Sequence, residues 1–361
     1  MMRRYPELGS ARVALLGLSA AVALAVVVVA AWSTPHPPPA VSVTSPRPGP
    51  PLATARIWGY QLQRLDPALI DPSIDMLVTD PSRDGSDAGR WSAEEVSALR
   101  RRDGAAPRIL LAYLSIGEAE AYRGYWRAHW RVAPPSWLGR ENPEWKGNFA
   151  VRYWEPGWQR LHLDPEPTFL RRVVRRWLPG LLPIPALDRI LAAGFEGVYL
   201  DKVDGFEDWA AERPAAAEEM ADFVESISAY AKARRPGFLV VPQNGEELLR
   251  RPSYVAAIDG IAKEDLRFGV GGDGTPNSGD DLAASLAALA LATAAGRPVF
   301  QVEYLDDPAA MRQATDRAAE DGFRLLFARR GLDLPPELPP SAGLSAPHPA
   351  GTASSTGPSS R

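Results

Sequence analysis

The chain has no cysteine among its 361 residues. It therefore forms no disulfide, uses no thiolate as a nucleophile and holds no metal through cysteine sulfur. Histidine is also scarce: there are four, and His129 and His162 lack the i, i+4 spacing of an HExxH zinc helix. We interpret both as structural residues. These shortages leave carboxylates as the main source of chemistry.

A concentrated positive charge is missing too. The 40 Lys and Arg residues are outnumbered by 44 Asp and Glu residues, and the arginines are scattered along the sequence. Because a nucleic-acid-binding protein needs a basic patch, we expect no nucleic-acid partner. A glycine-rich phosphate loop does not follow the first predicted strand, and the run at residues 269–274 (GVGGDG) predicts a flexible surface loop. No cofactor is expected.

The N-terminal segment differs in composition from the rest. Arg3, Arg4 and Arg12 precede an uncharged run at residues 13–32, which is about long enough to cross a bilayer as a helix. Positive charges before such a run favour a cytoplasmic N-terminus. We expect residues 1–32 to be an uncleaved membrane anchor that leaves the domain on the extracytoplasmic face. The alternative is a cleaved signal peptide and a secreted protein.

Proline-rich segments border the predicted domain. Residues 33–54 predict a stiff, extended linker. Residues 333–361 form a Pro/Ser-rich tail that predicts disorder. The folded domain is then expected at residues 55–332, a length that fits a single large α/β barrel.

Short apolar runs alternate with helix-period segments across this domain, which is the pattern of repeated β-α units. Helices are predicted at residues 92–102, 185–193, 215–234, 280–295 and 308–321. Strands are predicted at residues 57–63, 76–80, 109–115, 149–153, 197–201, 238–243, 260–264 and 299–303. Eight parallel strands fit a closed (β/α)8 TIM barrel better than an open sheet, so the predicted fold class is α/β.

Several predicted strands end in an acidic residue. Asp201 follows an apolar strand, where a buried charge needs a reason. In a TIM barrel, the loops at the carboxyl ends of the strands form the active site. Alternation along the strands predicts that Asp201, Glu264 and Glu303 point into the barrel. Phe300 and Val302 would then pack outward.

The longest motifs together match a known family. They are residues 58–63 (WGYQLQ), 111–120 (LAYLSIGEAE), 122–126 (YRGYW), 142–148 (NPEWKGN), 153–159 (YWEPGWQ), 194–204 (GFEGVYLDKVD), 242–247 (PQNGEE) and 302–306 (VEYLD). With these motifs in this order, the chain resembles glycoside hydrolase family 114, the endo-α-1,4-polygalactosaminidase-like proteins, over residues 57–306. The resemblance implies a TIM barrel and retaining hydrolysis by an aspartate and a later glutamate, which correspond to Asp201 and Glu264. Glu246 and Glu303 stay open as alternative partners of Asp201.

Glycoside hydrolysis needs one protonated and one ionised carboxyl group. We expect Asp201 to be the nucleophile and Glu264 the general acid/base. The structural alternatives for Asp201 are an ion pair with Lys202 or a nearby arginine, or a cap of the following turn. For Glu264 the alternative is an ion pair with Lys263 or Arg267.

Candidate substrate-binding residues accompany this pair. Aromatic rings can stack on the apolar faces of sugars, amides can bond to hydroxyls, and clustered acids attract a cationic amino sugar. The candidates are Trp58, Tyr60, Gln61, Asp80, Tyr113, Glu118, Tyr153, Lys202, Asp204, Gln243, Asn244, Glu246, Glu303 and Tyr304. The structural alternatives are buried aromatic packing, an internal amide network and ion pairs.

The leading hypothesis is a monomeric, membrane-tethered, extracytoplasmic glycoside hydrolase that cuts an amino-sugar or related polysaccharide. A non-catalytic carbohydrate-binding barrel would keep the aromatic residues but would need no pair of acids. A metal-dependent hydrolase of another cell-envelope polymer could use Asp80, Asp201, Asp204 and Glu303 as oxygen ligands, and a chelator would then inhibit it. Hydrolysis by two carboxyl groups requires no metal.

Overall fold

The computed structural model describes residues 52–164, 177 and 183–336. The predicted anchor, the linker up to residue 51 and the tail from residue 337 lie outside the described residues. Within the described ranges, no helix combines the length and the apolar character that crossing a bilayer requires. Residues 52–54 form a short 3-10 helix, η1 (Leu52–Thr54), with Leu52 buried. The prediction of an extended linker is therefore wrong for these three residues.

Eight parallel strands form the centre of the structure. They are β1 (Trp58–Tyr60), β2 (Met76–Thr79), β3 (Ile109–Ser115), β7 (Gly197–Asp201), β8 (Leu239–Pro242), β9 (Ile261–Glu264), β12 (Val299–Glu303) and β13 (Arg324–Phe327). The first five pair in the order β1-β2-β3-β7-β8, and the last three pair in the order β9-β12-β13. A parallel bridge between Gln243 and Ala262 joins the two groups. The predicted α/β class with a parallel sheet is confirmed.

The two ends of this strand series also meet. The backbone N–H groups of Leu62 and Gln63 donate to the carbonyl of Leu332, at 2.9 and 3.0 Å. The indole of Trp58 on β1 donates to the carbonyl of Arg324 on β13, at 2.8 Å. The strand order and these contacts are consistent with a TIM barrel.

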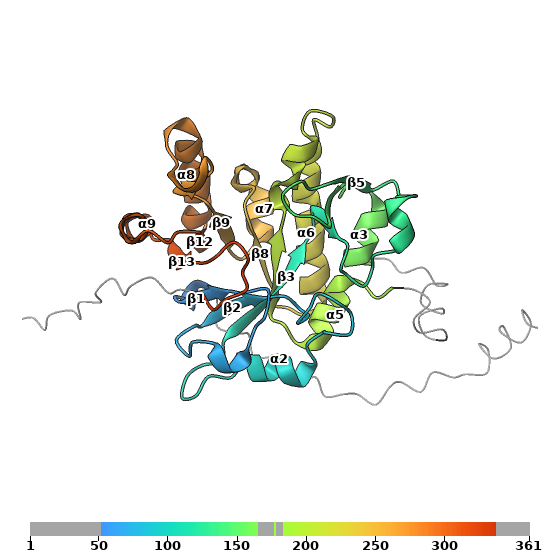
Figure 1. Ribbon diagram of the computed structural model, residues 1–361, viewed down its shortest axis with the longest axis horizontal. Helices are drawn as coiled ribbons and strands as arrows, with labels where there is room; N and C mark the ends of the chain where they lie inside the picture. The colour runs from blue at the N-terminus through green and yellow to red at the C-terminus, as the bar shows by residue number, and fades with distance from the viewer. Residues whose placement is uncertain (1–51, 165–176, 178–182, 337–361) are drawn as a thin grey trace, which may run out of the picture. The chain divides into compact units, whose positions relative to one another are not determined.

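Helices lie outside the strands, as Figure 1 shows for α2, α5, α6 and α7. Their bounds are α2 (Ala93–Arg100), α3 (Pro156–His162), α5 (Ala186–Ala193), α6 (Ala216–Arg234), α7 (Pro252–Ala257), α8 (Gly279–Ala294) and α9 (Pro308–Asp321), with 3-10 helices η2 (Pro67–Leu69), η3 (Ala128–Arg131), η4 (Val203–Trp209) and η5 (Glu246–Arg250). The five predicted helices correspond to α2, α5, α6, α8 and α9. Helix α2 begins at a capping box, in which Ser92 and Glu95 each bind the other's backbone N–H.

One predicted barrel strand is wrong. The segment at residues 149–153 contributes to β6 (Asn148–Val151), which pairs antiparallel with β4 (Glu118–Glu120) and β5 (Leu138–Glu141) in a separate sheet. The eighth barrel strand is β13, which the sequence analysis missed. An apolar segment predicts a strand but does not say which sheet it joins. The glycine-rich run at 269–274 falls in a hairpin of β10 (Phe268–Gly269) and β11 (Gly272–Pro276), in which β11 is exposed.

Apolar residues on both faces of the barrel strands are buried. Tyr199, Phe300 and Val302 belong to a cluster drawn from all eight strands, which is the barrel interior. Val198 and Leu200 pack instead with residues of the helices. Asp201 shares the inner face of β7 with Tyr199, as predicted, because successive side chains alternate.

The predicted orientation of β12 is wrong. Phe300 and Val302 face the barrel interior, so Glu303 points outward toward the helices. The reason is that the strand carries apolar residues on both faces, which is typical of buried parallel strands, so alternation alone does not decide which face turns inward.

Gly117 allows the ends of β3 and β7 to approach closely. A Cβ atom at this position would lie 2.1 Å from the backbone oxygen of Lys202. The backbone N–H of Ile116 also donates to the carbonyl of Asp201, at 3.0 Å. Any side chain at Gly117 would therefore push the segment that carries Asp201 out of place.

We predict that Gly117→Ala lowers the free energy of unfolding by about 1 to 3 kcal/mol, because overpacking forces backbone shifts. Denaturant titration measures this change. Gly205→Ala is the matched control, since its Cβ would meet its nearest neighbour at an ordinary 3.4 Å. Equal midpoints for the two variants would contradict the predicted clash.

Candidate active site

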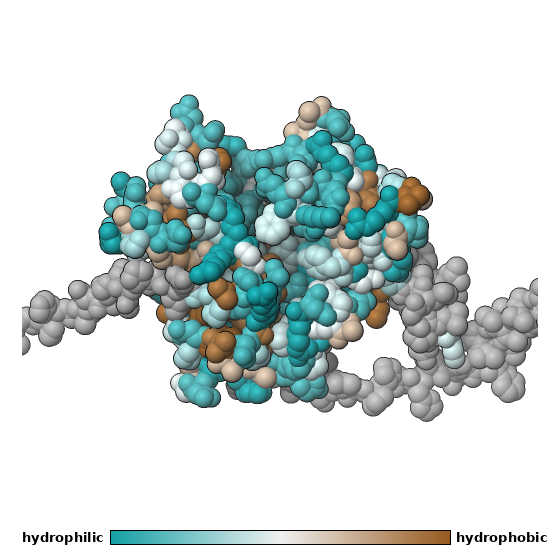
Figure 2. Space-filling model, viewed as in Figure 1, coloured by the Kyte–Doolittle hydropathy of each residue, from teal (hydrophilic) through white to brown (hydrophobic). Residues whose placement is uncertain are grey.

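A cavity of about 630 Å³ opens at the carboxyl ends of the barrel strands, and we call it the main cavity. Figure 1 shows β3 pointing toward this end, and Figure 2 shows mainly hydrophilic residues around the hollow there. Its size is typical of ligand-binding sites, and its location is that of the active site in TIM-barrel enzymes. The predicted acids that line it are Asp80, Glu118, Asp201, Asp204 and Glu264.

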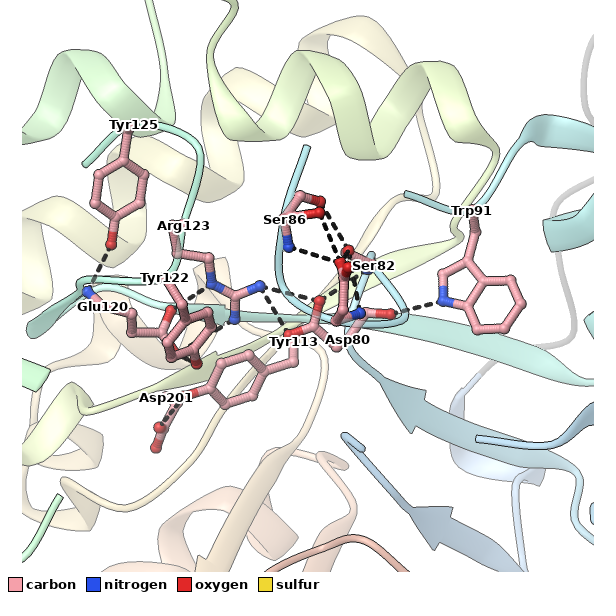
Figure 3. Close-up of polar contacts among 11 residues, drawn as sticks. Asp80, Ser82, Ser86, Trp91, Tyr113, Glu120, Tyr122, Arg123, Tyr125 and Asp201 are labelled. Atoms are coloured by element: carbon pink, nitrogen blue, oxygen red, sulfur yellow. Dashed lines mark hydrogen bonds and ion pairs between the residues drawn. The ribbon is translucent and has the colours of Figure 1, made fainter. Parts of the chain in front are cut away.

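Asp201 ends β7 and accepts two short hydrogen bonds. The hydroxyl of Tyr113 donates to Oδ2 at 2.6 Å, and the backbone N–H of Lys202 donates to Oδ1 at 2.8 Å. Figure 3 shows the Tyr113 hydroxyl aimed at the carboxyl group. Burial and the nearby charge of Glu264 raise the pKa of Asp201 to about 7, although the bond from Tyr113 opposes this rise. Asp201 therefore holds a proton more readily than an exposed aspartate does.

Glu264 ends β9 in a similar environment. The hydroxyl of Tyr304 donates to Oε2 at 2.7 Å, while the amide of Asn244 donates to Oε1 at a longer 3.3 Å. The same amide donates to Asp204 at 3.2 Å. Burial raises the pKa of Glu264, and the hydrogen bond from Tyr304 opposes this. Two carboxyl groups with raised pKa values thus line one cavity.

The backbone turns sharply where these strands end. Lys202, Asn244 and Asp265 follow β7, β8 and β9, and each has a positive φ, of 57°, 59° and 50°. Residues with a Cβ seldom adopt this left-handed conformation, and such strain concentrates at functional sites. All three residues themselves line the main cavity.

The other acids of the main cavity are held by specific partners. Glu118 accepts hydrogen bonds from the amides of Asn142 and Asn148, at 2.8 and 3.3 Å. Asp80 pairs with Arg123 at 2.7 Å, and burial raises the pKa of Asp80 to about 6 although Arg123 lowers it. Among the described residues, no three His, Asp or Glu side chains form a group that could hold a metal ion.

The remaining predicted residues that line the main cavity are Tyr60, Tyr113, Lys202, Gln243, Asn244 and Tyr304. The ring of Tyr60 packs against that of Tyr199 at 4.9 Å, and its hydroxyl donates to Gln243 at 3.3 Å. The ammonium group of Lys202 lies 3.7 Å from Asp204, whereas its backbone N–H binds Asp201.

The alternative ion pairs for Glu264 do not form. Lys263 pairs with Glu246 at 3.1 Å, and Arg267 pairs with Asp321. Both cations that the sequence offered to Glu264 are thus engaged by other carboxylates, which leaves Glu264 bound by uncharged donors.

Three predicted sugar-binding residues lie elsewhere. Trp58 is buried inside the barrel, where its indole binds Arg324. Gln61 is buried and its amide donates to the carbonyl of Gln63 at 3.0 Å. Tyr153 is fully buried and its hydroxyl donates to a backbone carbonyl of α6 at 2.7 Å. Apolar packing and internal hydrogen bonds account for the positions of these three side chains. The structural alternatives to sugar binding therefore apply to them.

Two predicted acids also lie outside the lining of the main cavity. Glu246 is buried between Lys263 and the hydroxyl of Ser285, which donates to it at 2.5 Å. Glu303 is fully buried on the outer face of β12, and it accepts the backbone N–H of Arg267 at 2.8 Å and the amide of Gln301. This geometry favours Glu264 as the partner of Asp201.

Two further aromatic residues lie at the edge of the main cavity. They are Tyr122 and Trp145, with 51% and 49% of their surface exposed. Both fall within the motifs quoted for the family resemblance, which gave the signal for them. The sequence analysis missed Arg330, which also lines the cavity. It follows β13, the strand that the sequence analysis did not find, so no pattern pointed to it.

The chain is similar in sequence to known proteins. The family model described as glycoside-hydrolase family GH114 matches residues 38–339. An uncharacterized protein of Deinococcus radiodurans is 37% identical over 302 residues, which are 82% of this chain and 88% of that protein. An uncharacterized protein of Methanocaldococcus jannaschii is 36% identical over 260 residues, 70% of this chain and 67% of that one.

Two solved structures share the fold. The Aspergillus fumigatus protein Ega3, in complex with galactosamine, aligns with a TM-score of 0.54 at 17% identity, over 80% of this chain and 97% of that one. The glycoside hydrolase domain of PelA from Pseudomonas aeruginosa aligns with a TM-score of 0.54 at 17% identity, over 77% and 96%. The family match and the relatives together show that the chain is a glycoside hydrolase that belongs to family GH114.

Proposed function

We propose that the protein hydrolyses glycosidic bonds of an amino-sugar polysaccharide, with Asp201 as the nucleophile and Glu264 as the general acid/base. The observation that carries this proposal is that both carboxyl groups are half-buried, line the same cavity and have raised pKa values. Paired carboxyls of this kind supply the acid and the base of glycoside hydrolysis.

The hydrogen bonds support this division of roles. Both oxygens of Asp201 accept short bonds from donors, which favours the ionised form that a nucleophile needs. Only one oxygen of Glu264 accepts a short bond, and its Oε1 accepts a long bond from an amide that Asp204 shares. Protonation of Glu264 also removes the charge that raises the pKa of Asp201. The arrangement with a neutral Glu264 and an ionised Asp201 is therefore self-consistent.

In the proposed reaction, Glu264 donates its proton to the glycosidic oxygen while Asp201 attacks the anomeric carbon. The bond to the leaving sugar breaks, and a covalent ester forms between the remaining sugar and Asp201. Glu264, now ionised, then takes a proton from water, whose oxygen displaces Asp201 from the sugar. Each step inverts the anomeric carbon, so the net outcome is retention.

The charge of the main cavity supports a cationic substrate. Its lining holds nine Asp and Glu residues against five Lys and Arg residues, and a concave acidic site concentrates cationic ligands. The structural relative Ega3 was solved with galactosamine, an amino sugar. We therefore infer that the substrate is a polymer that contains sugars with free amines, such as α-1,4-linked galactosamine.

The location of the protein is part of the proposal and rests on the sequence. Residues 13–32 would anchor the protein, residues 55–332 would form the catalytic domain outside the cytoplasm, and the protein would act as a monomer. Fractionation of cells should find the full chain with membranes, and a chain that lacks residues 1–32 should not be exported. Recovery of the full chain in the cytosol would argue against the anchor.

We predict that Asp201→Asn lowers kcat on an α-1,4-linked galactosamine polymer by roughly 10³-fold or more, because the amide cannot form the ester. Release of reducing ends measures the rate, and circular dichroism checks the fold. Asp208→Asn, the same change on an exposed residue seven positions on, is the matched control. Wild-type turnover by Asp201→Asn would remove Asp201 from the mechanism.

We also predict that the first product keeps the anomeric configuration of the substrate, since a covalent intermediate gives two inversions. Proton NMR of the early reaction distinguishes the two anomers before mutarotation. In Glu264→Ala, azide should restore turnover of an aryl glycoside, whose leaving group departs without protonation, and should give a glycosyl azide with retained configuration, because azide needs no general base. An inverted first product would show that water attacks directly and that Asp201 acts as a base.

A further inference from the structure

Two tyrosines contact the proposed catalytic pair in matching ways. Tyr113 lies on β3 and donates to Asp201, and Tyr304 directly follows β12 and donates to Glu264, at 2.6 and 2.7 Å. Burial raises the pKa of both phenols well above the ordinary value, so both remain neutral donors near neutral pH. The orientation of each ring therefore decides whether its carboxyl group keeps this bond.

Arg123 lies beside the ring of Tyr113. Its guanidinium carbon lies 5.8 Å from the centre of the Tyr113 ring and 4.9 Å from that of Tyr122. Its nitrogens bind Asp80 and Glu120, each at 2.7 Å. Figure 3 shows Arg123 between the two acids, beside the Tyr113 ring that reaches Asp201. The Arg123 side chain is 12% exposed, so the group is firmly enclosed.

Arg330 lies beside the ring of Tyr304, as Arg123 lies beside that of Tyr113. Its guanidinium carbon lies 4.5 Å from the centre of the Tyr304 ring. It binds both oxygens of Asp265 at 3.0 Å and one oxygen of Asp273 at 2.6 Å. Asp265 is the neighbour of Glu264 in the chain, so Arg330 holds both the ring and the strand end. In contrast to Arg123, its side chain is 37% exposed.

We propose that Arg123 and Arg330 are positioning residues that act through Tyr113 and Tyr304, and that each keeps one phenol donor on one carboxyl of the catalytic pair. The inference deepens the proposed function and rests on it. A planar guanidinium that binds two carboxylates at once cannot rotate freely, and it restricts the motion of a ring that lies against it. Lysine, with a single point charge, lacks this fork.

Other titratable groups influence the two carboxyls, and they come from several elements. Those around Asp201 are Tyr60, Tyr113, Tyr199, Lys202, Asp204 and Glu264. Those around Glu264 are Tyr60, Tyr199, Asp201, Asp204, Asp265 and Tyr304. Tyr113 and Tyr304 are distinguished among them because their hydroxyls donate directly to a carboxyl oxygen. Their removal should therefore change the titration of one carboxyl at a time.

The first test is the pH profile of kcat/KM for Tyr113→Phe and Tyr304→Phe. Loss of a donor to the ionised form raises the pKa of a carboxyl. The acidic limb reports the nucleophile, which must be ionised, and the basic limb reports the acid, which must be protonated. Tyr113→Phe should therefore move the acidic limb up by about one pH unit, and Tyr304→Phe should move the basic limb up by about one pH unit. Unmoved limbs in both variants would overturn the proposal.

The second test places the arginines in double-mutant cycles with the tyrosines. Arg123→Lys should move the same limb in the same direction as Tyr113→Phe, and should add no further shift when Phe is already present. An equal shift in both backgrounds would show that Arg123 acts directly on Asp201 and would overturn the proposal. Arg317→Lys, in an exposed pair with Glu320, is the matched control.

If Arg123→Lys does not fold, variants of Arg330 still test the proposal. Arg330 is partly exposed, and Arg330→Lys with Tyr304→Phe forms the equivalent cycle on the basic limb. Failure of the proposed function gives a different result, because wild-type protein that cleaves no galactosamine polymer, or an active Asp201→Asn variant, would overturn it. The other possible result is a fully active protein with a bell-shaped pH profile, in which none of the four substitutions moves either limb. That result would overturn only the role of the arginines.

Discussion

The partial burial of two carboxyl groups in one cavity is the constraint on which the rest of the site depends. A buried charge without partners is costly, and two like charges in the same cavity raise the pKa of at least one of them. The protein meets this constraint with neutral donors, chiefly Tyr113 for Asp201 and Tyr304 for Glu264. Such donors stabilise a negative charge but add no positive charge, so a carboxyl group can still take up and release a proton.

Positive charge is present near the pair but is held one step away. Arg123 is bound between two acids, Arg330 binds Asp265 and Asp273, and the ammonium of Lys202 lies nearest to Asp204. An arginine in direct contact with Asp201 or Glu264 would lower the pKa of that carboxyl and fix it in the ionised form. The surrounding ion pairs therefore make the site rigid, while the side chains that contact Asp201 and Glu264 directly are neutral.

Much of the barrel and the centre of its site could be predicted from local sequence. Apolar strands that end in an acid predicted where Asp201 and Glu264 lie, and the helix-period segments predicted α2, α5, α6, α8 and α9. Local patterns suffice there because the carboxyl ends of parallel strands must meet on one side of a barrel. The same reasoning brought Asp80 and Asp204 to the cavity, since both follow such strands.

The failures have a common physical cause, which is that they concern contacts between distant segments. Glu303 ends a strand as Asp201 does, but Phe300 and Val302 pack in the barrel interior, so Glu303 points outward. The rings of Phe300 and Trp58 lie 5.4 Å apart there. Arg330 has no local signal, since its partner Asp265 is 65 residues away in the chain. Alternation tells which residues share a face, whereas the choice of the inward face depends on which side chains fill the barrel. For an apolar parallel strand, the inward face is therefore set by its neighbours, and with it the acids that can reach the substrate.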